Sequence, residues 1–116
     1  MPASQAARQA RLWYWQRISA MVLALCVVVH LATIIVAVRG GLDAGEILAR
    51  TQGNWGFGLF YLAFVVAVTV HAPIGLARIA EEWLGLKARA SNLLAALFAA
   101  ALLALGLRAV WAVFAA

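Results

Sequence analysis

His71 lies near the end of a long apolar segment, and two residues that follow it at helical spacing complete a pattern that could bind a metal cofactor. In a helix, Gly75 lies one turn after His71 on the same face, and Arg78 lies two turns after it. The imidazole can ligate iron, the missing side chain of Gly75 lets a flat porphyrin approach the backbone, and the Arg78 guanidinium can pair with a propionate carboxylate. The pattern therefore indicates a haem b site.

A purely structural interpretation of these residues is the alternative. A histidine inside a membrane can hydrogen-bond a neighbouring helix, a glycine can be a helix-packing contact, and an arginine at the end of a span can extend its charge to the membrane surface. Ionisable groups at membrane depth are rare and usually functional, which favours ligation. Pro73 is expected to bend the helix beside His71, because it leaves the carbonyl of Thr69 without its helical partner.

The elements that position these residues are predicted to be membrane-spanning helices. The chain has 116 residues, of which 67% are hydrophobic and only 11% are charged. Three charge-free apolar stretches are each long enough to cross a hydrocarbon core of about 30 Å at about 1.5 Å per residue. With their flanks, the predicted spans are 13–38, 55–80 and 91–114. The expected fold class is therefore all-α, an integral membrane three-helix bundle that forms a single domain over residues 1–116.

The basic residues predict the orientation of this bundle. One group precedes the first span and another brackets the link between the second and third spans, namely Arg8, Arg11 and Arg17, then Arg78, Lys87 and Arg89. Basic residues concentrate on the cytoplasmic side of membrane proteins, so the N-terminus is expected in the cytoplasm and the C-terminus outside. Because this rule also accounts for the net charge of +5, no nucleic-acid partner is expected.

The first span carries a polar stripe that should face protein or a cofactor, while the opposite surface should face lipid. The stripe consists of Gln16, Ser19, Cys26, His30 and Thr33. The Thr33 hydroxyl is expected to bond to a carbonyl of its own helix. Cys26 is the only cysteine of the chain, and it is interpreted as a small packing residue.

Two capping signals lie outside the spans. Asp43 and Glu46 are three residues apart, and they predict a capping box that opens a short helix near residues 44–50. Ser91 is predicted to be the N-cap of the third spanning helix. Small residues on that helix form a predicted packing face, made by Ala95, Ala99 and Gly106.

His30 and His71 could both ligate one haem, but their expected depths argue against it. His30 lies about 13 residues beyond Arg17 and His71 about 7 residues before Arg78, which places them about 20 Å and about 10 Å from the cytoplasmic edge. The two ligands of one haem should lie at similar depth. Each histidine, if it is a ligand, is therefore expected to find its opposite ligand in another chain.

The run Gln16-Arg17-Ile-Ser19, followed about fifty residues later by His71, Gly75 and Arg78, resembles a known family. It is similar to the cytochrome b membrane-anchor subunits of succinate dehydrogenases and related fumarate reductases. The similarity covers three helices in matching order and almost the whole chain. It implies that His71 is the haem b ligand on the second helix and that Arg78 lies close to the haem propionates.

The resemblance also implies a quinone pocket near the cytoplasmic end of the first helix. Arg17 and Ser19 match a quinone-binding pattern, and Trp13 lies one turn earlier, where the pocket often has a polar or aromatic residue. The sequence departs from the family where Ala20 replaces a glycine and Gln16 stands in place of a histidine found in many relatives. Glu81 and Glu82 occupy the region in which many relatives have an aspartate.

The implied function is that of a haem b anchor in a succinate:quinone oxidoreductase. One haem b is expected, and a second haem on His30 would match relatives that carry two. The expected partners are a flavoprotein and an iron–sulfur subunit on the cytoplasmic face, a second anchor chain or another copy of this one, and the lipid bilayer. The expected location is a bacterial-type inner membrane, which the chain would cross several times.

Other functions are weighed against this one. The chain has neither a dinucleotide fingerprint nor a cysteine cluster, so dicarboxylate oxidation is expected in the partners, and this chain would contribute only the quinone site. The alternatives are a cytochrome b anchor of another quinone-linked complex, such as a fumarate reductase, and a haem-free structural anchor. A proton-coupled transporter is disfavoured because all four acidic residues lie outside the predicted spans.

Overall fold

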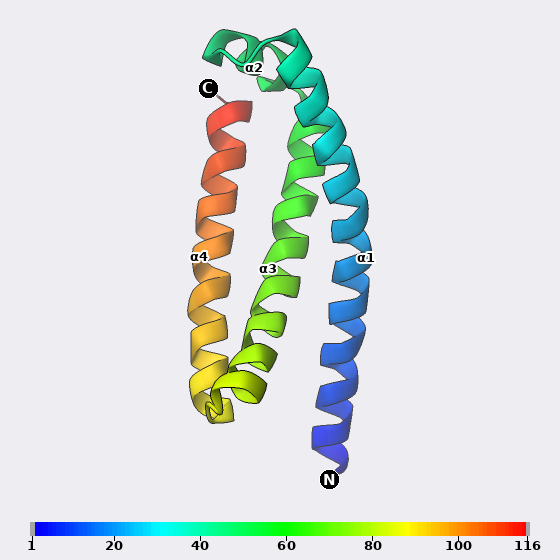
Figure 1. The fold of residues 1–116 in the computed structure, drawn as a ribbon, viewed down its shortest axis with the longest axis vertical. Helices are drawn as coiled ribbons and strands as arrows, with labels where there is room; N and C mark the ends of the chain where they lie inside the picture. Colours follow the sequence, from blue (N-terminus) through cyan, green and yellow to red (C-terminus); the bar gives the residue numbers. More distant parts are fainter. Residues whose placement is uncertain (1, 116) are drawn as a thin grey trace.

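The computed structural model describes residues 2–115, which form four α-helices (Figure 1). These helices are α1 (Ala3–Gly40), α2 (Ala44–Thr51), α3 (Trp55–Leu84) and α4 (Ala88–Phe114). By length and composition α1, α3 and α4 can each cross a membrane. The all-α fold with three long apolar helices is therefore confirmed, and α2 is a short helix in addition to them.

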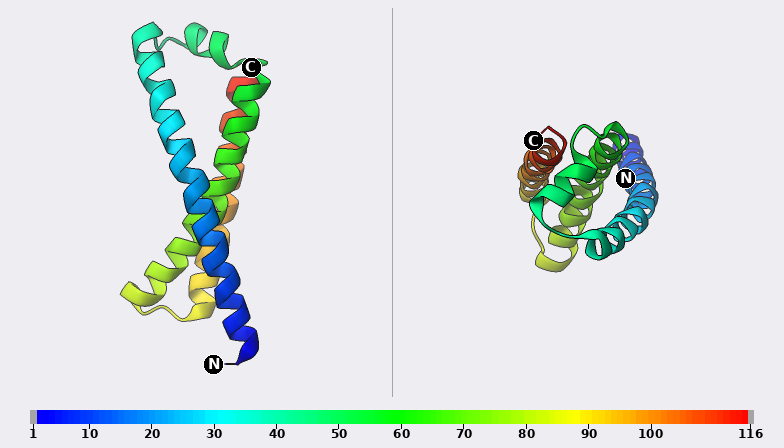
Figure 2. Two further views of the ribbon diagram at one scale, coloured as in Figure 1. Left: turned by 90° about the vertical axis from the view of Figure 1, so that its right-hand side faces the viewer. Right: turned by 90° about the horizontal axis from the view of Figure 1, so that it is seen from above.

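The three long helices form an elongated bundle with the two termini at opposite ends (Figure 1). The bundle measures 55 × 23 × 23 Å, so it is longer than a hydrocarbon core of about 30 Å. Figure 2 shows α1 crossing the α3–α4 pair obliquely. At its own C-terminal end α1 separates from this pair, and α2 spans the gap. Most large apolar side chains are exposed on the outside of the bundle, as expected for surfaces that face lipid.

One helix extends beyond its predicted span, and another begins before its predicted cap. α1 begins at Ala3 and continues without a break into the span. The alanine, glutamine and arginine residues of this segment favour helix, and an existing helix extends more easily than a new one forms. α4 begins at Ala88, so the predicted N-cap at Ser91 is wrong. The Ser91 N–H already bonds to the Lys87 carbonyl at 3.0 Å, and its buried hydroxyl has no partner among residues 2–115.

The connection between α1 and α3 contains the bond to the Asp43 side chain that the predicted capping box requires. Gly41 has φ of 121°, a conformation that favours glycine, and it ends α1. The Asp43 carboxylate accepts a hydrogen bond from the Glu46 N–H at 2.9 Å and caps α2. Arg50 then donates to the Gly41 carbonyl at 2.7 Å. The predicted short helix is therefore confirmed.

The link that follows α2 binds the end of α4. Thr51 donates its hydroxyl to the Val113 carbonyl at 2.8 Å, and the Gly53 N–H bonds to the Phe114 carbonyl at 2.9 Å. These bonds satisfy carbonyls that the end of a helix leaves without partners. They hold the link that precedes α3 against the C-terminal end of α4, while Pro73 lies in the C-terminal half of α3. Figure 2 shows that α3 changes direction in that half, as expected beside a proline.

Gly106 permits a close approach of α4 to α3. A Cβ atom at this position would lie 2.7 Å from Cγ1 of Val65. A real Cβ atom does not come this close to another side chain, so the small residue here fixes how near the two helices lie.

We expect Gly106→Val to lower the stability of the bundle by about 1–3 kcal/mol, because the added side chain forces α4 away from Val65. The measurement is the thermal unfolding midpoint in detergent. Gly56→Val is the matched control, because a Cβ atom there would meet only the Asn54 side chain at an ordinary 3.4 Å. Equal midpoints for the two variants would contradict this packing.

Candidate functional site

The interface between α1 and α3 contains the polar stripe of the first span. Ser19 and Cys26 are buried, and Gln16 and His30 are half-buried. Contacts to α3 come from both ends of the stripe, through Ser19 near the N-terminal end and Thr33 near the C-terminal end. The structure therefore places the stripe against protein.

His71 faces Ser19 across this interface. The Ser19 Oγ lies 3.5 Å from His71 Nδ1, at the long end of hydrogen bonding. The same hydroxyl donates its one proton to the Gln16 carbonyl at 3.2 Å. With that proton on the Gln16 carbonyl, Ser19 accepts from His71, and the Nδ1–H tautomer of the neutral imidazole satisfies this contact. The Nε2 atom of His71 keeps its lone pair, which is the form in which imidazole ligates a metal.

Gly75 lies beside the Gln16 side chain. A Cβ atom on Gly75 would meet Gln16 Nε2 at 3.4 Å, an ordinary contact, so packing within the chain does not require glycine here. The buried Oε1 atom of Gln16 has no hydrogen-bond partner among residues 2–115. A buried amide oxygen without a partner is unusual, and this one lies within the same helix pair as His71.

Arg78 lies seven residues after His71, about 10 Å nearer the N-terminal end of the bundle. Its side chain is exposed and borders a cleft between α1, α3 and α4. His71 does not line this cleft. The structure therefore keeps the two residues on the α1 side of α3 but at different depths.

His30 makes a second and separate contact with α3. Its Nδ1 atom lies 2.8 Å from the Tyr61 hydroxyl, which lies 3.1 Å from Thr33 Oγ1. Thr33 donates its proton to the His30 carbonyl at 2.7 Å, which confirms the bond predicted to its own helix. With that proton on the His30 carbonyl, Tyr61 donates to Thr33 and accepts from His30, and the Nδ1–H tautomer of neutral His30 satisfies both contacts with the Nε2 lone pair free. Phe64 packs edge-on against the same ring, with 5.7 Å between the centroids.

The two histidines lie far apart along the bundle. Ser19, the partner of His71, precedes His30 by 11 residues on α1, and Tyr61, the partner of His30, precedes His71 by 10 residues on α3. These separations correspond to about 15 Å along the helices. The structure therefore does not bring the histidines together around one iron atom.

The three residues assigned to a quinone pocket fall into two groups. The Arg17 Cζ atom lies 5.4 Å from the centroid of the Trp13 ring, and both side chains are exposed. Ser19 is buried on another face of α1, beside His71. The structure thus unites Trp13 with Arg17 and separates both from Ser19.

Tyr61 is the site residue that sequence reasoning missed. It lies inside the second predicted span, and the sequence signal was its hydroxyl, which needs a hydrogen-bond partner when it is buried. Among residues 2–115, no group of three or more histidine, cysteine, aspartate or glutamate side chains could hold a bare metal ion. An iron atom at either histidine would take most of its ligands from a porphyrin.

Comparison with known proteins decides the family. The family model described as the succinate dehydrogenase/fumarate reductase transmembrane subunit matches residues 2–107. The chain belongs to this family. No curated protein and no solved structure matches the chain. The expected resemblance is therefore confirmed across nearly the whole sequence.

Membership fixes the general role of the protein. As a transmembrane subunit of this family, it is a multi-pass integral membrane protein and a membrane anchor of the complex II type, associated with the other subunits of its complex. The family match covers α1 and α3, so it includes both histidine contacts.

Proposed function

We propose that this transmembrane subunit holds haem b at His71 and serves electron transfer to quinone in a succinate:quinone oxidoreductase. The observation that carries the proposal is the contact between Ser19 and His71, which leaves Nε2 of a membrane-embedded imidazole free to ligate iron. The flavoprotein and iron–sulfur subunits would dock on the cytoplasmic face, at the N-terminal end of the bundle, in a bacterial-type inner membrane. The C-terminus would lie outside.

The residues around His71 fit the cofactor. Ligating histidines usually donate their other ring N–H to a nearby acceptor, and Ser19 supplies that acceptor. Gly75 adds no side chain to the interface. Arg78, about 10 Å nearer the cytoplasmic end, would pair with a propionate carboxylate. When bound, haem b supplies a centre that accepts and releases single electrons.

The opposite ligand of each haem would come from another chain. His30 is about 15 Å from the level of His71, so it does not complete the same iron site. The other chain would be a second anchor subunit or another copy of this one. Shared ligation would then join the membrane subunits.

A quinone would bind near Arg17 and Trp13. Arg17 is exposed close to the cytoplasmic end of the span, where its guanidinium can donate to a quinone oxygen while the Trp13 ring packs beside the headgroup. Ser19 would take part only if its hydroxyl turned away from the Gln16 carbonyl. These residues bind and orient the quinone, and the oxidation of the dicarboxylate belongs to the partner subunits.

A reduced-minus-oxidised optical spectrum of the purified complex, with its soluble subunits attached, tests this function. We expect a b-type signal that succinate reduces and an added quinone reoxidises. A signal that responds to quinol and fumarate but not to succinate would assign the chain to a fumarate reductase or another quinone-linked complex. An active complex without any haem signal would leave only the structural anchor.

The Tyr61–Thr33 chain of hydrogen bonds favours His30 as the ligand of a second haem. We expect Tyr61→Phe to lower haem affinity at that site roughly 10-fold, because it removes the acceptor of the Nδ1–H while keeping the aromatic ring. The measurement is the haem-to-protein ratio. Tyr14→Phe is the matched control, since Tyr14 is exposed on α1. An unchanged ratio in Tyr61→Phe would remove His30 from the proposal.

A further inference from the structure

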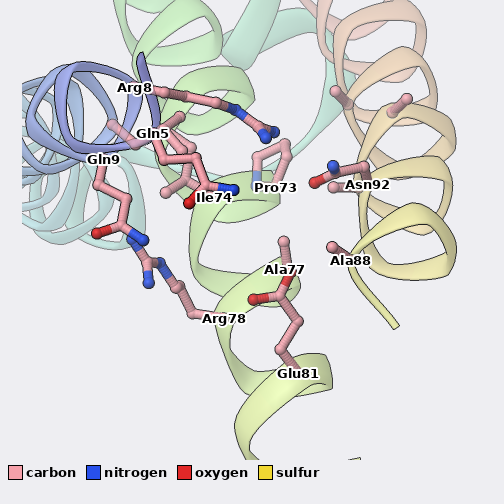
Figure 3. Close-up of a pocket in the computed structure, with 14 residues that line it drawn as sticks. Gln5, Arg8, Gln9, Pro73, Ile74, Ala77, Arg78, Glu81, Ala88 and Asn92 are labelled. Atoms are coloured by element: carbon pink, nitrogen blue, oxygen red, sulfur yellow. The ribbon is translucent and has the colours of Figure 1, made fainter. Parts of the chain in front are cut away.

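A cleft of about 450 Å³ lies between α1, α3 and α4 at the N-terminal end of the bundle. Figure 3 shows side chains from all three helices around it. Neither histidine lines this cleft, and neither do Arg17 or Trp13. Its lining therefore includes residues that the proposed electron transfer does not use.

The lining changes from polar to apolar with depth. Gln5, Arg8 and Gln9 line it near the start of α1, whereas Ala95 and Ala99 line it farther along α4. From Ala88 to Ala99 the cleft follows α4 for 11 residues, or about 16 Å. Because the α1 residues precede the interfacial Trp13, the polar part lies at the membrane surface and the apolar part lies within the hydrocarbon. A ligand that fills the cleft must be amphipathic.

The polar part carries an excess of positive charge. Arg8 and Arg78 line it together with a single carboxylate, that of Glu81. Figure 3 shows the Arg8 guanidinium reaching from α1 past Pro73 toward the middle of the cleft, with the Asn92 amide pointing into it from α4. Arg78 lies to one side, next to Gln9. The central cation is thus Arg8, which has no role in the proposed haem or quinone sites.

We propose that this cleft binds an anionic phospholipid, with the phosphate at Arg8 and Asn92 and an acyl chain along the alanine surface of α4. A guanidinium makes strong, charge-assisted hydrogen bonds to phosphate oxygens, and an amide adds a further donor. The alanines leave room for a hydrocarbon chain between the helices. The proposal does not depend on haem or quinone.

Native mass spectrometry of the purified complex, incubated with vesicles of phosphatidylglycerol or of phosphatidylcholine, tests the site. We expect retained phosphatidylglycerol to fall about 10-fold in Arg8→Gln. Arg11→Gln is the matched control, because Arg11 is an exposed cation one turn away on α1 that does not line the cleft. It should retain phosphatidylglycerol like the wild type. Asn92→Leu should lose part of the binding without changing the charge.

Three results would overturn the proposal. Equal losses in Arg8→Gln and Arg11→Gln would show general attraction to a basic surface. Equal retention of phosphatidylcholine and phosphatidylglycerol by the wild type would show that the site does not select the net negative charge of phosphatidylglycerol. Displacement of phosphatidylglycerol by millimolar inorganic phosphate would assign the polar part to free phosphate. In each variant, co-purification of the soluble subunits reports that the complex is still assembled.

Discussion

His71→Ala is expected to remove the b-type optical signal of the site at His71, with a loss of roughly 10-fold or more. The substitution deletes the only ring that presents a free Nε2 at this depth of the α1–α3 interface. The reduced-minus-oxidised spectrum of the purified complex measures the loss. His30→Ala is the matched variant, because it removes a half-buried imidazole from the same helix pair at another depth.

A comparison of His71→Ala with Ser19→Ala separates ligation from packing. If His71 only bonds Ser19, then His71→Ala and Ser19→Ala should have similar and small effects on stability and leave the spectrum unchanged. If His71 ligates iron, Ser19→Ala should retain the haem with a shifted potential, because the ligand keeps its Nε2 but loses the acceptor at Nδ1. Full haem content in His71→Ala would show that the ligand lies elsewhere.

Arg17→Ala is expected to lower the kcat for quinone reduction about 100-fold, the usual effect of removing one preorganised donor from a developing negative charge. Succinate-dependent quinone reduction by the whole complex is the measurement. Arg11→Ala is the matched control, since it removes an exposed cation from the same helix, away from the Trp13 contact.

A second assay distinguishes quinone chemistry from assembly. Reduction of a water-soluble dye depends only on the soluble subunits, so it should proceed at the wild-type rate in Arg17→Ala. Parallel losses of dye and quinone reduction would mean that Arg17 holds the subunits together. Full quinone reduction in Arg17→Ala would remove Arg17 from the quinone site.

Much of the fold could be predicted from composition and local chemistry. An apolar, charge-free stretch of sufficient length has few stable forms other than a spanning helix, because backbone groups in hydrocarbon must bond within the chain. The cap at Asp43 is also local, since it needs only a side chain and an N–H three residues away. The predicted cap at Ser91 is wrong because α4 begins at Ala88, so Ser91 already lies inside the helix and its N–H bonds to the Lys87 carbonyl.

The grouping of Arg17 with Ser19 shows a limit of motif reading. Residues two apart on a helix lie about 200° apart around its axis, so one side chain can be exposed while the other is buried. A motif records that two residues occur together in a family. It does not say that they face the same ligand within one chain.

The sequence by itself determined the three apolar helices, the polar stripe of α1 and the family pattern that includes His71. Only the tertiary structure decided which atoms meet across α1 and α3. It brings the Ser19 hydroxyl to one histidine and the Tyr61 hydroxyl to the other, each with its own proton already committed. The physical reason is that the hydrogen-bond partner of Nδ1 favours one tautomer of each imidazole. In both cases this partner comes from the other helix, which is distant in sequence.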